Sequence, residues 1–148
     1  MTLVTSSALS VDRFGAANSA LAITSGYATV PPGVYFDPST GGLTIMLWVK
    51  MLAFPSSGRS ARFIDFCIGS ELDNFRFGTE PSQRLKLVVY KGSTYKLVES
   101  TSLLQLNQWT HIAATVNGSN GFSFINGTLN SQVTGLIFLS SHLEISFF

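Results

Sequence analysis

The sequence contains few charged residues, and this shortage limits the ligands that the protein can bind. Lys, Arg, Asp and Glu together make up 11% of the 148 residues, against roughly 25% in an average globular domain. The formal net charge is +1 at pH 7. Because phosphate binding requires clustered Lys and Arg, we expect no nucleic-acid partner. Hydrophobic residues reach 45%, so the chain can bury a core and we expect it to fold.

Long apolar runs are also missing. A membrane-spanning helix needs about 20 consecutive apolar residues. The longest apolar stretch near the C-terminus, Leu136 to Leu139, is followed by two serines and a histidine, and then by Glu144. We therefore expect no insertion into a membrane. Met1 to Ser7 carry neither the basic start nor the apolar run of a secretory signal, so the chain either stays inside the cell or is a piece of a longer protein.

The sequence has a single cysteine, Cys67, which excludes an internal disulfide. The framework of disulfides that stabilises many small secreted domains is therefore absent. Cys67 lies in the largely apolar run from Arg62 to Gly69, and we interpret it as a small buried hydrophobic residue. A catalytic thiol would need an activating histidine beside it, and the sequence places neither of its two histidines nearby.

Apolar residues do not recur anywhere with the spacing of a helix. Short apolar or alternating runs are separated by turn residues instead. The predicted strands are Ala20–Ile23, Tyr27–Val30, Leu43–Met51, Arg62–Ile68, Asn74–Phe77, Leu85–Tyr90, Tyr95–Glu99, Thr110–Val116, Gly121–Ile125 and Thr128–Val133. Short strands at this spacing predict one all-β domain over residues 1–148, either an antiparallel sandwich or a barrel.

Three of these segments carry more information. Both faces of Leu43–Met51 are largely apolar, which predicts a central strand covered on both sides. Leu85–Tyr90 alternates more cleanly, which predicts one face in contact with solvent. The dipeptide Asn126-Gly127 is the signal of a type I′ hairpin, because both central residues of that turn need positive φ.

Three longer segments, taken in order, resemble a known family. The first is Asp12-Arg-Phe-Gly-Ala-Ala-Asn-Ser-Ala-Leu-Ala-Ile23, followed by Tyr27-Ala-Thr-Val-Pro31. The second is Gly42-Leu-Thr-Ile-Met-Leu-Trp-Val-Lys50. The third is Leu106-Asn-Gln-Trp-Thr-His-Ile-Ala-Ala-Thr-Val116, followed by Phe122-Ser-Phe-Ile-Asn-Gly127. Together they span residues 10–130 and resemble the laminin G-like (LamG-like jelly-roll) modules of the concanavalin A-like lectin/glucanase superfamily.

The resemblance implies an antiparallel two-sheet jelly-roll β-sandwich of the concanavalin A-like type. It says little about the ligand, because this architecture carries lectins, adhesion modules and glucanases alike. We expect Trp48 and Trp109 to pack in the core, where indole rings supply a large apolar area. His111 shares a face with Trp109 and Ala113, and we expect it to be a hydrogen-bonded histidine in or near the core rather than a metal ligand.

The sequence departs from the family at both ends. Modules of this kind usually begin with a strand upstream of the Asp12-Arg13-Phe14-Gly15 run, and none is recognisable here. The segment 134–148 does not resemble the usual closing portion. We therefore expect a module that is truncated at both ends. The loss of the terminal pair of strands would leave an open sheet edge, through which two copies could associate.

One motif suggests an enzyme. Glucanases of this superfamily carry E-x-D-x-E or E-x-D-x-x-E on a strand, with the first Glu as nucleophile and the last as general acid. This chain has Glu71 and Asp73, but Phe75 and Arg76 stand where the acid should be. Without a proton donor the leaving oxygen departs unassisted, so we expect no hydrolase activity.

The remaining hypothesis is ligand binding. Candidate oxygen ligands cluster at Glu71, Asp73 and Asn74 and, separately, at Asn117, Ser119 and Asn120. Such groups either hold Ca²⁺, as in many lectins, or are simply solvated loops, and the sequence leaves both alternatives open. Asn117 and Asn126 also begin N-x-[ST] sequons, which would carry glycans in a secreted protein. Chance occurrence is the other account, since Asn126 is already explained by its turn.

We therefore expect a non-catalytic recognition module that binds a glycan or a protein, as part of a larger extracellular or cell-surface protein. The alternative is a structural or assembly domain that mediates protein–protein contact or self-association without binding sugar. The low charge and the 12 Phe favour this alternative, since a sticky surface is harder to explain in a free monomer. A glycan array would distinguish the two.

Overall fold

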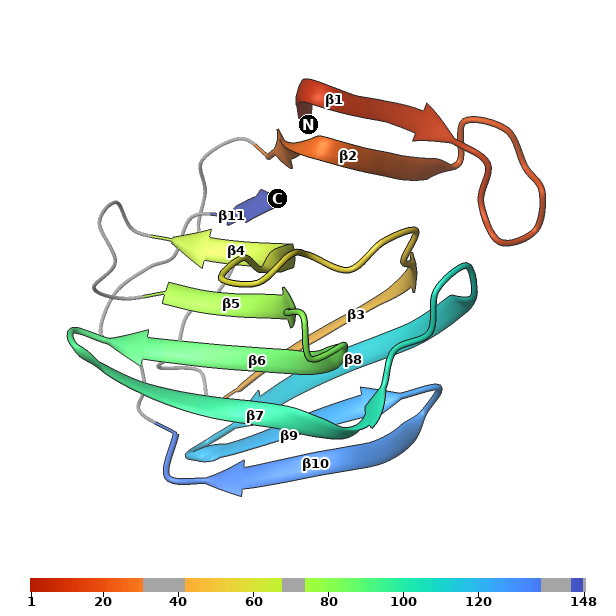
Figure 1. The fold of residues 1–148 in the computed structure, drawn as a ribbon. Coiled ribbons are helices and arrows are strands. Elements are labelled where there is room, and N and C mark those ends of the chain that lie inside the picture. Colours follow the sequence, from red (N-terminus) through yellow and green to blue (C-terminus); the bar gives the residue numbers. More distant parts are fainter. Residues whose placement is uncertain (31–41, 68–73, 137–144, 148) are drawn as a thin grey trace.

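The computed structural model describes residues 1–30, 42–67, 74–136 and 145–147 (Figure 1). Within these ranges the chain forms eleven strands. The described residues include no helix that is long and apolar enough to cross a membrane. Residues 31–41, 68–73, 137–144 and 148 lie outside the description.

The strands form two sheets in which every neighbouring pair is antiparallel. The larger sheet has the order β1-β2-β11-β4-β5-β6-β7. Its strands are β1 (Thr2–Ser10), β2 (Ala20–Thr29), β4 (Ala61–Cys67), β5 (Asn74–Thr79), β6 (Arg84–Lys91), β7 (Thr94–Leu103) and β11 (Ile145–Phe147). The smaller sheet, in the order β10-β9-β8-β3, consists of β3 (Gly42–Lys50), β8 (Trp109–Asn117), β9 (Asn120–Ile125) and β10 (Thr128–Thr134). The predicted all-β two-sheet sandwich is confirmed.

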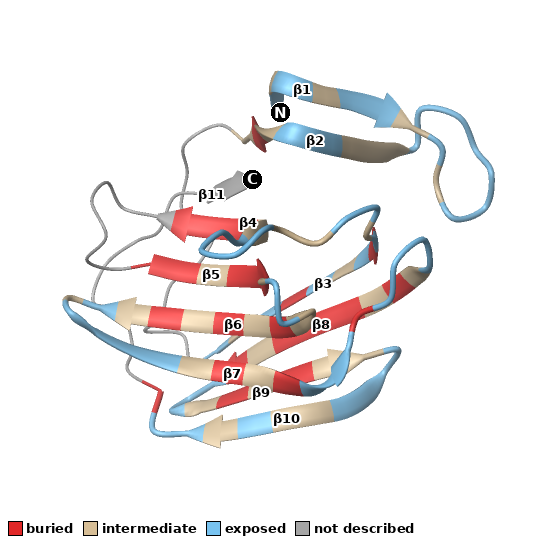
Figure 2. Ribbon diagram, viewed as in Figure 1, coloured by how far each residue is buried: buried red, intermediate tan, exposed pale blue. Residues whose placement is uncertain are grey.

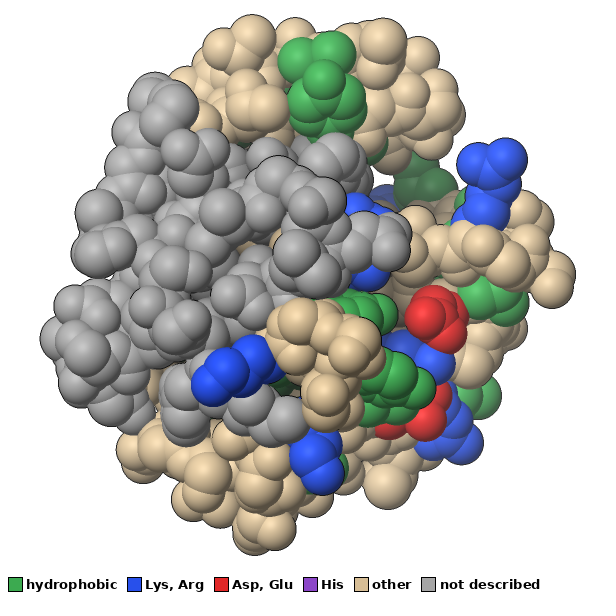
Figure 3. All heavy atoms as spheres, turned by 90° about the vertical axis from the view of Figure 1, so that its left-hand side faces the viewer, with side chains coloured by type: hydrophobic (Ala, Val, Ile, Leu, Met, Phe, Trp, Pro, Cys, Tyr) green, Lys and Arg blue, Asp and Glu red, His purple; other side chains and the backbone are tan. Residues whose placement is uncertain are grey.

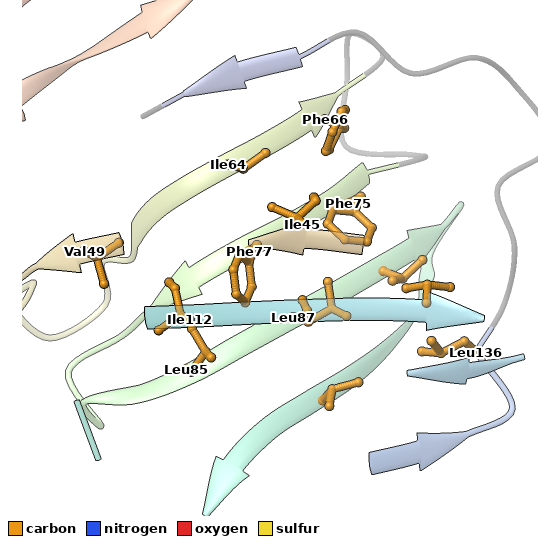
Figure 4. Close-up of a cluster of buried hydrophobic side chains, with 14 of the residues drawn as sticks. Ile45, Val49, Ile64, Phe66, Phe75, Phe77, Leu85, Leu87, Ile112 and Leu136 are labelled. Carbon is orange, nitrogen blue, oxygen red and sulfur yellow. The ribbon is translucent and has the colours of Figure 1, made fainter. Parts of the chain in front are cut away.

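The core lies between the two sheets, where buried residues recur along β4 to β9 (Figure 2) and their apolar side chains gather (Figure 4). In β6, Leu85 and Leu87 are fully buried, while Lys86 between them is half-exposed. Ile112 in β8 is fully buried as well, from the opposite sheet. Burying one large apolar side chain contributes roughly 1.5–3 kcal/mol. The buried cluster consists of Ile45, Val49, Ile64, Phe66, Phe75, Phe77, Leu85, Leu87, Val89, Val98, Leu104, Ile112, Ala114, Val116 and Leu136.

The hairpin predicted from Asn126-Gly127 is confirmed. Strands β9 and β10 pair across this turn, and φ is positive at both central residues, 50° at Asn126 and 78° at Gly127. Asn126 also ties the turn to β8: its backbone N–H donates to the His111 carbonyl at 2.8 Å, and its Oδ1 accepts the His111 N–H at 3.0 Å. The dipeptide therefore closes the hairpin and fixes it to the neighbouring strand.

On one side of the sandwich, the edge strands β7 and β10 are joined through Asn130. Its Oδ1 accepts the Ser102 backbone N–H at 2.9 Å, and its Nδ2 donates to Ser102 Oγ at 2.9 Å. Thr101 Oγ1 donates to the Asn130 carbonyl at 3.2 Å. These bonds link the two sheets along this side, whereas the opposite side ends in the edges of β1 and β3.

Both ends of the chain differ from the sequence-based expectation. A strand does precede the Asp12-Arg13-Phe14-Gly15 run, namely β1, which pairs with β2. Its Ser- and Thr-rich sequence lacks the apolar alternation that would have revealed it. Strand β11 lies between β2 and β4 and pairs with both, so the expected loss of the terminal strands is wrong. The larger sheet still ends in the free edge of β1, and association of two copies through a sheet edge stays a prediction. Strand β2 is continuous where two short strands were predicted.

The expected core positions of Trp48, Trp109 and His111 are wrong. Strands β3 and β8 pair so that Trp48 lies opposite His111 and Lys50 lies opposite Trp109. These side chains occupy the outer face, because the alternate residues of both strands, such as Ile45, already fill the inner face. Trp48 is 42% exposed, and Trp109 and His111 are half-buried. Trp109 and His111 do share a face, as expected, but it points away from the core.

Strand β3 is an edge strand of the smaller sheet and not the central strand that its apolar sequence predicts. Its inner face supplies Ile45 and Val49 to the core. Its outer face is not covered by another layer of the described residues, and Met46 there is 64% exposed. Two apolar faces thus mark a strand whose outward side chains remain available for contact with another molecule.

Candidate functional site

The outer face of the seven-stranded sheet carries charged and aromatic side chains side by side. Core residues alternate with them along β4, β5 and β6, so the inward side chains fix the outward direction of the others. This outward set, called the polar face, consists of Arg62, Asp65, Asn74, Arg76, Lys86, Tyr90, Tyr95 and Glu99, with Glu80 next to it after the end of β5. Figure 3 shows acidic side chains beside basic ones in its right half.

Asp65 is the most deeply buried charged group of the polar face, with 1% of its surface exposed. Its Oδ2 accepts a hydrogen bond from Arg62 Nη1 at 2.6 Å and lies 3.9 Å from Arg76 Nε. Among the described residues, no group donates a hydrogen bond to its Oδ1. Burial raises the pKa of Asp65 above its usual 3.8, against the opposing effect of Arg62 and Arg76. Because this oxygen is itself buried, it is not open to a ligand from solvent, and Asp65 acts here as the partner of the two arginines.

Lys86 forms the second charged group of the polar face. Its Nζ donates to Glu80 Oε2 at 2.6 Å and lies 3.4 Å from Glu99 Oε1. Burial alone would lower the pKa of Lys86, but the hydrogen bond and charge of Glu80, with those of Glu99, outweigh burial and raise it. The ammonium is therefore held in its charged form between two carboxylates, each of which presents further acceptor oxygens at the surface.

Two tyrosines form the aromatic part of the polar face. Tyr90 in β6 lies opposite Tyr95 in β7, with ring centroids 5.5 Å apart and ring planes inclined by 37°. The Arg76 guanidinium carbon lies 4.9 Å from the centroid of the Tyr90 ring, so this arginine joins the tyrosines to Asp65. Tyr95 is 57% exposed, which leaves its ring open to a bound molecule.

Of the first predicted cluster of oxygen ligands, the structure describes only Asn74. Asn74 lies on the polar face at the start of β5, but its side chain is fully buried. Glu71 and Asp73 lie outside the described residues. Within the described part of the chain, no three His, Cys, Asp or Glu side chains gather as a metal site. A Ca²⁺ site at Glu71 and Asp73 therefore stays a prediction.

The second predicted cluster belongs to the other sheet. Asn117 and Asn120 pair with each other at the turn between β8 and β9, where Asn117 is exposed and Asn120 half-buried. As a sequon, Asn117 is thus accessible on the surface, whereas the side chain of Asn126 already accepts the His111 N–H. Glycosylation of either residue stays a prediction, and so does ligand binding by Asn117 and Asn120.

Sequence reasoning missed the main residues of the polar face. The alternation of Leu85–Tyr90 does predict one solvent-facing side, and reading that side to its end would have identified Tyr90. Asp65 is harder to find, because it is a single carboxylate within an apolar run. Its contact with Arg76 depends on the register of β4 against β5, in which the two residues lie opposite each other. Register is a tertiary property that one strand alone does not reveal.

Several solved structures share this fold. The mouse laminin alpha1 chain, domains LG4-5, is 15% identical, with a TM-score of 0.58, over 72% of this chain and 28% of that chain. A native heptameric SAP-like pentraxin from Limulus polyphemus is 12% identical, with a TM-score of 0.52, over 72% of this chain and 52% of that one. The carbohydrate-binding module CBM66 from Bacillus subtilis is 8% identical, with a TM-score of 0.51, over 82% of this chain and 72% of that module.

The chain thus spans less than two thirds of the laminin and pentraxin chains, and at these identities the likeness concerns the fold alone. A search of curated proteins finds no match. The family model Laminin_G_3, described as the concanavalin A-like lectin/glucanases superfamily, matches residues 23–141. The matched residues include β3, the Trp109-Thr-His111 segment and the Asn126-Gly127 turn, which carry the resemblance in the sequence. The chain belongs to the laminin G-like family of the concanavalin A-like lectin/glucanases superfamily.

Proposed function

We propose that the protein is a non-catalytic recognition module whose polar face binds a glycan. The observation that carries this proposal is the exposed Tyr95 ring beside its partner Tyr90, with the Arg76 guanidinium against the Tyr90 ring and the partly exposed carboxylates of Glu80 and Glu99 nearby. Apolar sugar faces pack on aromatic rings, and sugar hydroxyls both donate and accept hydrogen bonds. The polar face offers both kinds of contact.

The charges of the polar face favour a neutral sugar. Its ion pairs contain three acidic side chains, Asp65, Glu80 and Glu99, and three basic ones, Arg62, Arg76 and Lys86. These charges balance, so the face has no strong preference for an ionic ligand. The oxygens and N–H groups at the exposed ends of these pairs supply acceptors and donors for hydroxyl groups.

The same face argues against hydrolysis. A glycosidase needs a second carboxyl group that donates a proton to the leaving oxygen. Arg76 stands at the outward position where the glucanase motif has its acid, and Phe75 points into the core. Asp65 is occupied by Arg62 and Arg76. The proposal is therefore recognition without bond cleavage.

We further propose that the module acts outside the cell or on its surface, as part of a larger protein. Two of the similar structures are a laminin chain and a pentraxin, and this chain matches only 28% and 52% of them. The third is a carbohydrate-binding module. These likenesses support the proposed context, and secretion of the full-length protein with a tag would test it.

A glycan array with the full chain tests the proposed ligand. We expect binding to neutral oligosaccharides, and a loss of about tenfold or more when Tyr95→Ala removes a stacking ring. The matched control is Lys96→Ala, which changes the next residue of β7, also exposed and directed to the other side. Absence of any neutral glycan ligand, or equal losses in both variants, would refute glycan recognition at the polar face.

The second candidate function is assembly through protein–protein contact without sugar. Exposed apolar side chains on β3 and on the β1–β2 hairpin support it, namely Leu3, Leu9, Ile23 and Met46. Sedimentation equilibrium over a wide concentration range measures self-association directly. A monomer at every concentration, together with glycan binding, would exclude self-association in favour of recognition.

A further inference from the structure

The four-stranded sheet has a charge distribution unlike that of the polar face. Its strands β3, β8, β9 and β10 contain no Asp or Glu, and their only Lys or Arg is Lys50. Lys50 lies opposite Trp109 on the outer face, next to the pair Trp48 and His111. We call these four residues, together with Arg13, the cationic aromatic face. It presents positive charge and aromatic rings without any acidic side chain from the sheet.

Arg13 is held in place by a rigid turn. The Oδ1 atom of Asp12 accepts the backbone N–H groups of Phe14 at 2.8 Å and of Ala16 at 2.9 Å. Gly15 completes the turn with φ at 88°, a conformation that favours glycine. The turn therefore fixes the backbone from which Arg13 and Phe14 project as neighbours.

The guanidinium of Arg13 lies against two aromatic rings. Its central carbon lies 3.9 Å from the centroid of the Phe14 ring and 4.2 Å from the ring of Trp48. Both distances place the guanidinium in contact with the rings, so its N–H groups are the polar part of the side chain with which a ligand can pair. Arg13 is exposed to solvent. Within the described part of the chain, no carboxylate or carbonyl lies within hydrogen-bond distance of it.

An exposed arginine of this kind suits a planar acceptor. A carboxylate binds a guanidinium through two parallel hydrogen bonds, which fix its orientation as well as its position. Neighbouring groups reinforce the preference for an anion. Lys50 supplies a second positive charge, and the ring of His111 lies 5.3 Å from Trp48.

The surroundings distinguish a peptide from a sugar. Large aliphatic side chains stand exposed around the cationic aromatic face, where apolar side chains of another protein could pack. Met46 and Leu129 lie at the two ends of one row across the sheet, Met46–Ala113–Phe124–Leu129. Leu106 is exposed and bridges Met51, beyond the end of β3. One face of the Trp48 ring is already covered by Arg13.

We propose that the cationic aromatic face binds an acidic peptide segment of a partner protein. One carboxylate of the segment pairs with the guanidinium of Arg13, a second approaches Lys50, and an apolar side chain packs on Met46. The site lies on the other sheet from the polar face and does not depend on glycan binding. It takes a second ligand of different chemistry.

Fluorescence anisotropy with a labelled peptide of alternating Glu and Leu tests this proposal. The peptide matches β3 in length, nine residues, and the control peptide has Gln in place of every Glu. We expect the full chain to bind only the Glu peptide, and Arg13→Ala to weaken binding about 10- to 100-fold. Arg13→Lys keeps the charge but loses the planar fork, and should recover only part of the affinity.

Two further variants separate binding from folding. Lys50→Gln leaves the Arg13 turn intact and should still weaken the Glu peptide, whereas Lys96→Ala removes a positive charge from the other sheet and should not. Tyr95→Ala should leave peptide binding unchanged, so that a failure of the glycan proposal stays distinct. Equal binding of the two peptides, unchanged affinity in Arg13→Ala and Lys50→Gln, or tighter binding of an acidic oligosaccharide than of the Glu peptide would overturn the proposal.

Discussion

The two outer faces of the sandwich cover the same core but differ in how they arrange charge. On the polar face, acids and bases are paired, as with Asp65 and Arg62 or Lys86 and Glu80. On the cationic aromatic face, Arg13 stacks on rings and the sheet beneath it contains no acid. The inward side chains of both sheets are uniformly apolar apart from a few hydroxyls. The fold therefore constrains the inner face, and specificity resides in the outward positions.

The largest effect is expected from a change that both faces share. Phe77 is fully buried, and its ring lies 6.2 Å from Phe63 in an edge-to-face arrangement. Phe77→Ala should lower the free energy of unfolding by about 3–5 kcal/mol, because it leaves a cavity in the core. Denaturant unfolding measures this loss, and both ligand assays should fail together near the midpoint. A cost below about 1 kcal/mol would contradict the placement of Phe77.

An intermediate effect should appear on the polar face alone, and it depends on pH. The folded-state pKa of Asp65 is raised above 3.8, so the folded protein binds this proton more readily than the unfolded chain. The stability linked to Asp65 is present below 3.8 and is lost as pH rises through the raised pKa. The free energy of unfolding of the wild type should therefore fall relative to Asp65→Asn over this window.

Chemical denaturation of both proteins at pH values on either side of 3.8 measures the trend. The strands of the cationic aromatic face contain no carboxyl group, so Lys50→Gln should show the same pH dependence as the wild type. A wild type that gains stability over Asp65→Asn with rising pH would mean that the arginines, and not burial, control the pKa of Asp65.

The smallest effect on stability is expected at Met46. This side chain is 64% exposed, so Met46→Ser should change the free energy of unfolding by no more than about 0.5 kcal/mol. The same change should weaken the Glu peptide and leave glycan binding unaltered, which sharpens the distinction between the two faces. Fluorescence anisotropy with the Glu peptide and a glycan array, measured in parallel, check this. Equal losses of peptide affinity and of glycan affinity would contradict the distinction between the two faces.

The sequence predicts those parts of the fold that depend on local patterns. Alternation locates the strands of the sandwich body, and the need for positive φ locates the turn at Asn126 and Gly127. Strand β11 has only three residues and is defined by its pairing with β2 and β4. No local sequence pattern predicts such a pairing. The resemblance to the laminin G-like family predicts the architecture, and the match over residues 23–141 confirms it.

The site was harder to predict, because alternation tells which residues share a face but not which face is inside. Both sides of β3 are apolar, and the large ring of Trp48 led to the prediction that its side faces the core. The core instead contains the smaller Ile45 and Val49 from the opposite side of the strand. Asn74 was chosen as a ligand from its residue type, yet its side chain is buried. Contacts such as Arg13 on Trp48 join residues from different strands and loops, and only the tertiary fold creates them.

The place of β11 in the larger sheet imposes an order on assembly. Hairpin β1–β2 is synthesised first, but its hydrogen-bonded connection to the remaining strands of the sheet runs through β11, which is made after every other described strand. Until β11 has been made, the hairpin lacks this connection to the later strands, and Leu3 and Leu9 are exposed even in the complete fold. Among the described strands, the two made first are thus connected to their sheet by the one made last.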